Sequence, residues 1–210
     1  MARTNFFTQA DLRSIRYAIV GGEAMPLDLI VKWQQKGIPI RQGYGLTEFG
    51  PNVFSLNEED ALRKIGSIGF PNFYIEDKIV DDRGRQVIGE GSGELLLRGP
   101  VCSPGYWRNS EESAKTFQND WAHTGDLVRR DTEGYYYVIG RKKDMYISGG
   151  ENIYPAEIEQ ILRAHPSIRE AAVIGVADSQ WGEVGKAYVV LEPNASFSAE
   201  SIVAHCKNNL

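Results

Sequence analysis

The sequence predicts a mixed α/β and α+β protein built from three successive parts. Residues 1–68 alternate apolar strand-like runs with a helical pattern, which is typical of the tail of an α/β layered domain. In residues 69–142, short β-prone runs are separated by Gly- and Asp-rich turns at even spacing, and this favours a small antiparallel β-barrel. Residues 143–210 follow a charged joint and mix helical and strand patterns, so we expect a small α+β domain there.

The composition is that of a globular protein with one or two domains: of 210 residues, 42% are hydrophobic and 24% are charged. The net charge of -5 argues against nucleic acid or an anionic membrane as the main partner. No apolar run has the length of a transmembrane segment. Cys102 and Cys206 lie far apart and outside any Cys/His metal pattern, and we therefore expect a cytoplasmic protein.

The first part reads as a strand, a glycine turn, a helix and a second strand. An apolar strand is expected over 17–20, a turn at 21–23, a helix over 26–36 and a short strand over 38–41. Ligands of α/β layers bind beyond the carboxyl ends of the strands. That edge would include both the glycine turn and the next segment, residues 42–48.

Segment 42–48 carries side chains suited to a nucleotide. Gly43 and Gly45 let the backbone approach a ligand, and Tyr44 between them offers a flat face for a base. Thr47 offers a donor for a phosphate oxygen, and Glu48 offers a hard oxygen for Mg²⁺. The same pattern also occurs in ordinary turns, so both interpretations stand at this point.

In the middle part we expect strands over 74–80, 94–98 and 135–139, with tight aromatic turns at 103–107 and 121–127. The second turn presents Asp126 directly after a glycine.

A carboxylate in that place can accept hydrogen bonds from two ribose hydroxyls; the alternative is that Asp126 caps its own turn. His123, with no partner evident in the sequence, is interpreted as structural rather than as a general base.

The joint begins after the strand at 135–139, with four charged residues at 141–144 and a short apolar run at 145–147. Gly149 and Gly150 follow. Such a pattern predicts a hinge that leads to a place where the backbone approaches a ligand, and a surface hairpin is the alternative.

The last part contains an amphipathic helix over 155–165, strands over 171–177 and 187–192, and a final helix that Ser198 can cap. The helical pattern is still running at Leu210, so we expect the chain to be truncated.

Five motifs in order along the chain resemble those of the adenylate-forming superfamily, which comprises acyl- and aryl-CoA ligases, peptide-synthetase adenylation domains and beetle luciferases. Each motif alone is weak, but the ordered set is specific and covers essentially the whole chain. The motifs are GGEAMP at 21–26, YGLTE at 44–48, GELLLRGP at 93–100 with GYW at 105–107, TGD at 124–126, and GRKKD at 140–144 with GGEN at 149–152.

The resemblance implies an ATP-binding site with Mg²⁺ at Glu48, in which Thr47 faces the α-phosphate and both residues are catalytic. It also implies a hinge at Lys143, about which a C-terminal lid rotates, and a CoA site formed by Gly149, Gly150 and Trp181. The residues that it assigns to the ATP or AMP nucleotide are Gly22, Glu23, Tyr44, Gly45, Thr47, Asp126 and Arg141.

The activity implied is that of an acid–thiol ligase, which condenses a carboxylic acid with ATP to an acyl-adenylate, releases pyrophosphate and passes the acyl group to CoA. Positioning and charge stabilisation suffice for this chemistry, so the lack of a nucleophile triad is consistent with it. An acyl-AMP ligase or peptide-synthetase domain that loads a carrier-protein thiol is the alternative, and luciferase-like oxidation has less support. A non-catalytic nucleotide-binding or interaction module is the alternative of another class.

The acid is left open by the sequence. Gly45 and Gly50 leave room, which is compatible with an extended acyl chain such as that of a fatty acid.

Two features of the superfamily are missing from this chain: the glycine-rich phosphate loop and the lysine near the C-terminus, for which Lys186 is no substitute. We therefore expect the isolated chain to be inactive in adenylation. Uncovered edges of its α/β layer would favour self-association, including a homodimer.

Overall fold

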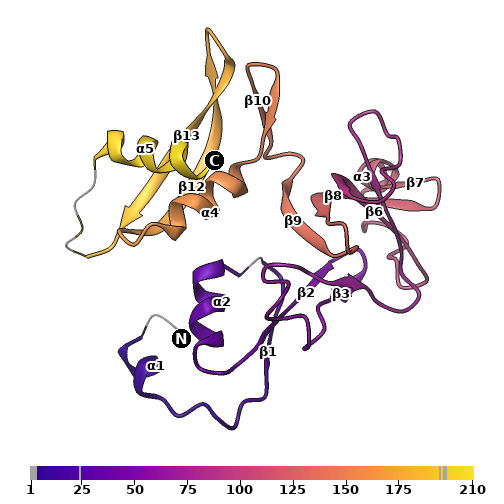
Figure 1. Ribbon diagram of the computed structural model, residues 1–210. Coiled ribbons are helices and arrows are strands. Elements are labelled where there is room, and N and C mark those ends of the chain that lie inside the picture. The colour runs from indigo at the N-terminus through magenta and orange to yellow at the C-terminus, as the bar shows by residue number, and fades with distance from the viewer. Residues whose placement is uncertain (1–3, 24, 194, 196–197) are drawn as a thin grey trace. The chain divides into compact units, whose positions relative to one another are not determined.

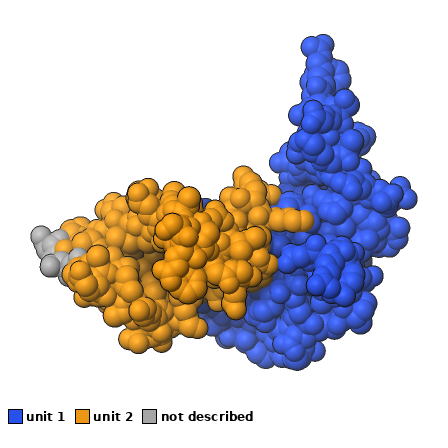
Figure 2. Space-filling view, turned by 90° about the horizontal axis from the view of Figure 1, so that it is seen from above, with its two compact units in different colours: residues 1–138 blue, residues 139–210 orange. Residues whose placement is uncertain are grey.

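The computed structural model describes residues 4–23, 25–193, 195 and 198–210 (Figure 1). The chain divides into two compact units, Met1–Val138 and Ile139–Leu210, which Figure 2 colours separately. This division falls within a strand, whereas the sequence suggested a boundary at 142/143. The proposed three-part division stays a prediction.

The first sheet of unit 1 has four strands in the order β1-β2-β3-β4. β1 and β2 are parallel, and the helix α2 connects them, which is the strand–turn–helix–strand order expected from the sequence. A short helix, α1, precedes them. The elements are α1 (Asn5–Gln9), β1 (Ala18–Val20), α2 (Leu27–Gln34), β2 (Ile40–Leu46), β3 (Gly50–Ser55) and β4 (Phe70–Pro71).

The second sheet lies in unit 1 except for the end of β9. It has five strands and curls into half a barrel. The order is β5-β6-β8-β7, with β9 also paired to β8, and the pairs β5–β6, β6–β8 and β7–β8 are antiparallel. The elements are β5 (Glu76–Val80), β6 (Gly91–Arg98), α3 (Ser110–Thr116), β7 (Phe117–Gln118), β8 (Trp121–Arg130) and β9 (Tyr136–Arg141).

The turn expected at 121–127 is wrong, because these residues lie inside strand β8. The side chains of Ala122, Thr124 and Asp126 are buried at every second position, as in a half-buried strand. Two of these three residues are polar, so the alternation of burial does not show as an alternation of hydrophobicity.

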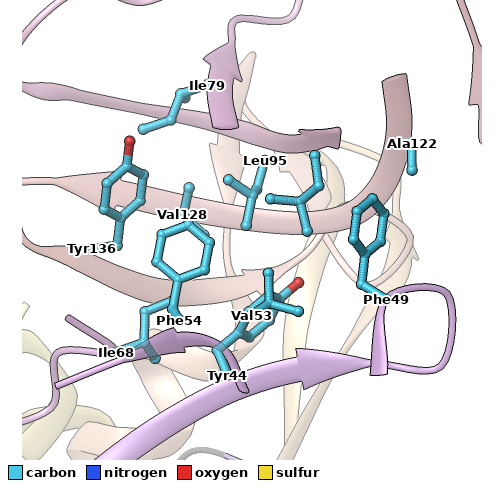
Figure 3. Close-up of a cluster of buried hydrophobic side chains, with 11 residues drawn as sticks. Tyr44, Phe49, Val53, Phe54, Ile68, Ile79, Leu95, Ala122, Val128 and Tyr136 are labelled. Atoms are coloured by element: carbon cyan, nitrogen blue, oxygen red, sulfur yellow. The ribbon is translucent and has the colours of Figure 1, made fainter. Parts of the chain in front are cut away.

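Side chains of both sheets form the main core of unit 1. Figure 3 shows Tyr44 on β2 and Phe54 on β3 directed toward Leu95 on β6 and Val128 on β8. Phe54, Leu95 and Val128 are 0% exposed, and burying an apolar side chain of this size stabilises the fold by about 1.5–3 kcal/mol. The two sheets of unit 1 therefore share one hydrophobic core.

Unit 2 combines helices with an antiparallel sheet, which is the α+β fold class that the sequence predicted for residues 143–210. Its sheet has the order β11-β10-β13-β12, and its core includes Leu162 of α4, Ile168 of β12 and the partly buried Ile202 of α5. The elements are β10 (Tyr146–Ser148), β11 (Glu151–Ile153), α4 (Pro155–Ala164), β12 (Ile168–Asp178), β13 (Gly182–Leu191) and α5 (Ala199–Asn209).

The helix signals of unit 2 are confirmed. Pro155 occupies the first turn of α4, where its missing N–H is not needed. The Ser198 hydroxyl accepts a hydrogen bond from the N–H of Ser201 and so caps α5. In the described part of the chain, no helix is both long and apolar enough to cross a membrane.

Candidate functional site

Thr47 and Glu48 lie at the tip of the β2–β3 hairpin, where Leu46 pairs with Gly50. The two strands approach so closely here that a Cβ on Gly45 would be 2.6 Å from the carbonyl oxygen of Gly50. Any other residue at position 45 would force the hairpin apart. The hairpin therefore requires glycine at position 45, and the β3 backbone already occupies the space that a side chain there would fill.

The Glu48 carboxylate is held in place by the loop before α3. The Tyr106 hydroxyl donates a hydrogen bond to Glu48 Oε1, and the backbone N–H of Ser103 donates to the Glu48 carbonyl at 2.7 Å. The contact with the Glu48 carboxylate, together with partial burial, raises the pKa of Tyr106, so this hydroxyl remains a donor at neutral pH. The loop thus fixes one oxygen of the side chain predicted to bind Mg²⁺.

A β-bulge in β8 presents Asp126. The β6–β8 register slips between Glu94 and Leu96, so that residues 124–126 lie opposite the single residue Leu95. Gly125 stands in this bulge with φ of 68°, a conformation that side-chain-bearing residues rarely adopt. The extra residues bend the strand and turn Asp126 toward β2.

Asp126 and Tyr44 meet across 82 positions of sequence: the Tyr44 hydroxyl donates to Asp126 Oδ2 at 2.5 Å. The bulge that holds Asp126 is closed by Thr124, whose hydroxyl donates to the Leu95 carbonyl at 2.7 Å and accepts from the Asp126 N–H at 3.0 Å. Asp126 is 8% exposed and Tyr44 is 9% exposed. The structure therefore joins two residues assigned to the nucleotide, and it places the Tyr44 ring mainly in the core, with little of its face accessible to a base.

The glycine turn at 21–23 lies beside β2. A Cβ on Gly21 would be 3.3 Å from the carbonyl oxygen of Gly43. Just after the turn, the N–H of Met25 donates to the side-chain carbonyl of the buried Gln42 at 3.0 Å. Gly22 and Glu23 are exposed, as residues that contact a ligand from one side would be.

The residues predicted for CoA come together in unit 2. The Gly149 N–H donates to the Trp181 carbonyl at 2.9 Å, and a Cβ on Gly149 would be 2.9 Å from Cε3 of the Trp181 ring. Gly149 and Gly150 have φ of 60° and 91°. Trp181 is 53% exposed, so the indole covers the glycine turn with one part and meets solvent with another.

Arg141 and Lys143 belong to unit 2 and carry exposed side chains, Arg141 at the end of β9 and Lys143 in the turn that follows. Their assigned roles, ribose contact and hinge, stay predictions.

Glu48 fits a magnesium ion that a nucleotide would help to hold. Among the described residues, no group of three or more His, Cys, Asp or Glu side chains is arranged to bind a metal. Mg²⁺ commonly keeps several waters and uses one or two carboxylates together with substrate phosphates. A single fixed carboxylate is compatible with such a site.

Three supporting residues were not found by sequence reasoning: Gln42, Glu94 and Tyr106. Gln42 shares a face of β2 with Tyr44, at the period of two that a strand predicts. Glu94 and Tyr106 lie inside motifs that the sequence displays, but their contacts with the bulge and with Glu48 depend on tertiary structure.

Comparison with known proteins identifies the family of the chain. The sequence profile described as AMP-binding enzyme matches residues 1–107, and the profile described as AMP-binding enzyme C-terminal domain matches residues 157–210. The chain belongs to the AMP-binding enzyme family.

Particular relatives are CoA ligases by name. Feruloyl-CoA synthase from an Amycolatopsis species is 40% identical over 201 residues, which are 96% of this chain and 41% of that protein. The chain thus spans about two fifths of the length of this relative.

Solved structures of two further relatives superpose on the chain. The o-succinylbenzoate CoA synthetase of Bacillus subtilis, in complex with its acyl-adenylate intermediate, has a TM-score of 0.89 at 39% identity and covers 98% of this chain and 42% of its own. The same synthetase has been solved with ATP and a magnesium ion, with a TM-score of 0.87 at 39% identity over the same shares of the two chains. The amide bond synthetase McbA of Marinactinospora thermotolerans has a TM-score of 0.89 at 29% identity and covers 100% of this chain and 43% of its own.

Proposed function

We propose that this chain is the part of an AMP-forming acid–thiol ligase that holds the nucleoside of ATP and carries the CoA-binding lid. The observation that carries the proposal is the hydrogen bond between Tyr44 and Asp126, because it fixes the carboxylate that would meet the ribose. The overall reaction is the condensation of a carboxylic acid with ATP to an acyl-adenylate and pyrophosphate, followed by attack of the CoA thiol on the acyl carbon and release of AMP.

Asp126 binds the ribose in this proposal. A carboxylate can accept about four hydrogen bonds, so the bond from Tyr44 is compatible with bonds from the 2′- and 3′-hydroxyls of a ribose. The Tyr44 hydroxyl fixes the rotation of the carboxylate, and the bulge fixes its position. A ribose then meets acceptors that need little reorganisation, which favours affinity.

Thr47 and Glu48 act on the phosphates. The exposed Thr47 hydroxyl donates to an α-phosphate oxygen, and Glu48 holds Mg²⁺ through the carboxylate that Tyr106 orients. An ion bound there would supply charge neutralisation for the phosphates while a carboxylate oxygen of the acid attacks the α-phosphorus and pyrophosphate leaves. Turn 21–23 contacts the adenine from the side of β2.

Unit 2 provides the acceptor site. The exposed part of the Trp181 ring stacks on the adenine of CoA, and the turn of Gly149 and Gly150 lines the path of the pantetheine arm. Lys143 is the hinge about which unit 2 rotates between the adenylation and thioester-forming half-reactions. Relatives that are named CoA ligases favour CoA over a carrier-protein thiol.

The acid is a carboxylic acid, and we favour an aryl acid over a fatty acid. The acids in the relatives' names, ferulate and o-succinylbenzoate, both contain an aromatic ring. The glycine argument for an extended acyl chain loses weight, because the β3 backbone occupies the space beside Gly45.

The test is a calorimetric titration of the chain with AMP and with 2′,3′-dideoxy-AMP. Wild-type protein should bind AMP more tightly, and Asp126→Ala should remove this preference by weakening AMP alone. Asp120→Asn, which removes a carboxylate from an exposed turn of the same sheet, is the matched control and should behave as wild type. Equal affinity of the folded wild-type chain for both nucleotides, or no binding, would refute the proposal for this chain.

A further inference from the structure

A second buried carboxylate stands behind the bulge that presents Asp126. Glu94 on β6 is 6% exposed. A buried charge destabilises the folded state unless other groups pair with it or donate hydrogen bonds to it. Its register partner on β8 is Leu127, the residue next to Asp126. Two carboxylates, Glu94 and Asp126, therefore belong to the same short stretch of paired strand.

The bulge needs an acceptor for the backbone of Gly125. Of the bulge's polar groups, the Thr124 hydroxyl serves the Leu95 carbonyl and the Asp126 N–H. The Gly125 N–H instead points to Glu94, with 3.4 Å between the nitrogen and Oε1. This distance is at the long end for a hydrogen bond, and the charge of a carboxylate strengthens such a contact.

The same oxygen of Glu94 contacts a second group of the bulge strand. His123 Nδ1 lies 3.3 Å from Glu94 Oε1, and the His123 side chain is 32% exposed. Glu94 thus contacts β8 at two points: the side chain of His123, just before the bulge, and the backbone N–H of Gly125, within it. Since Gly125 has no side chain to restrict its φ and ψ, an external contact is what limits the rotation of its peptide.

We propose that Glu94 is a positioning residue for the nucleoside: it acts through the Gly125 peptide to hold the Asp126 carboxylate where the ribose diol meets it. This inference rests on the proposed function, in which Asp126 binds the ribose. A purely structural Glu94 would affect folding of the sheet and the affinity for every nucleotide alike. A positioning Glu94 affects the diol contact selectively.

Two substitutions of Glu94 distinguish the effect of its side-chain length from the effect of its charge. Glu94→Asp keeps the charge but withdraws the oxygen from Gly125 by one methylene, whereas Glu94→Gln keeps an acceptor oxygen at the original reach without the charge. The readout is the ratio of AMP affinity to 2′,3′-dideoxy-AMP affinity, measured by calorimetry on the full chain. Glu76→Ala, which removes an exposed carboxylate from the neighbouring strand β5, is the control.

We expect Glu94→Asp to reduce this ratio by about 10- to 100-fold, the loss expected when one hydrogen bond between the ribose diol and the charged Asp126 carboxylate is no longer made. The affinity for the dideoxy nucleotide should stay within about twofold. Glu94→Gln should lower the ratio less than Glu94→Asp does, because its amide oxygen still reaches Gly125, although without the charge that strengthens the contact.

Three results would overturn the inference: a wild-type ratio in Glu94→Asp, a loss in Glu94→Gln with none in Glu94→Asp, or an equal loss for both nucleotides. If wild-type protein itself shows no preference for AMP, the proposed function fails, and that outcome is distinct from the other three. Hydrogen exchange over residues 122–128 provides a check independent of ligand, since Glu94→Asp should speed exchange of the Gly125 amide.

Discussion

Replacing Gly45 with alanine tests how the β2–β3 hairpin places Thr47 and Glu48. The added methyl group would be 2.6 Å from the Gly50 carbonyl oxygen, 2.9 Å from Pro51 Cα and 3.0 Å from the Asn52 nitrogen. All three are backbone atoms, so no side-chain rotation relieves the overlap. Overpacking of this kind costs about 1–3 kcal/mol of the free energy of unfolding. For a chain of this size the melting temperature should fall by about 2–12 °C.

Gly43→Ala is the matched control in the same strand. Its methyl group would be 3.6 Å from both Asn52 Oδ1 and the Phe54 carbonyl oxygen, which are ordinary contact distances. A glycine-to-alanine change without overlap stabilises by about 0.4–1 kcal/mol through the unfolded chain. The two variants should therefore shift the melting temperature in opposite directions.

The assay is thermal unfolding followed by circular dichroism, with hydrogen exchange over residues 42–55 to locate the change. Exchange in the hairpin should speed up in Gly45→Ala and stay unchanged in Gly43→Ala. If both variants unfold at the same temperature, or if exchange rises equally in both, the close approach of β2 and β3 at Gly45 is not what fixes the hairpin tip.

Two further predictions concern other parts of the chain. Gly149→Ala should shift the indole N–H resonance of Trp181 in an NMR spectrum, because its methyl group would be 2.9 Å from the ring. Gly150→Ala is the control. It shares the backbone strain, at φ of 91°, but no atom lies within 4 Å of its methyl group, so it should leave that resonance in place. Burial raises the pKa of Asp131, but hydrogen bonds from Lys64 and from backbone N–H groups lower it more, so the folded pKa lies below its ordinary value. The resulting stability is present above the unfolded pKa of about 3.9 and is lost as the pH falls through the folded pKa. Asp131→Asn should thus reduce the pH dependence of urea unfolding below about pH 5, and an unchanged dependence would show that the Asp131 carboxylate does not carry this stability.

Local signals predicted most helices and strands. Pro155 and Ser198 predict the starts of α4 and α5, because the interactions that begin a helix involve only residues a few positions apart. Helix α3 was missed, since none of its residues is buried and it has no apolar face to display. Its local signals are Asn109, whose side chain accepts from the Glu112 N–H as an N-cap, and a charge pattern with acidic residues in the first turn and Lys115 in the last.

The bulge at Asp126 could not be predicted in the same way. The neighbours Gly125 and Asp126 indicate a turn when the sequence is taken locally, and only the pairing with β6 shows that they bulge from a continuous strand. The contact of Tyr44 with Asp126 has the same character. The motifs identified both residues, but the distance between them depends on the packing of two sheets.

That packing explains why the division predicted from sequence composition differs from the division into compact units in the structure. Residue 44 falls in the segment 1–68 and residue 126 in the segment 69–142, yet both belong to the compact unit Met1–Val138. Tyr44 packs edge-on against Phe54, with 5.9 Å between ring centroids, and Phe54 contacts Tyr136 in turn at 5.0 Å. The aromatic rings thus fill the space between the sheets, while the Tyr44 hydroxyl at their margin orients Asp126. A core substitution that shifts Phe54 should therefore alter the proposed nucleotide site through Tyr44, although Phe54 itself has no assigned contact with the nucleotide.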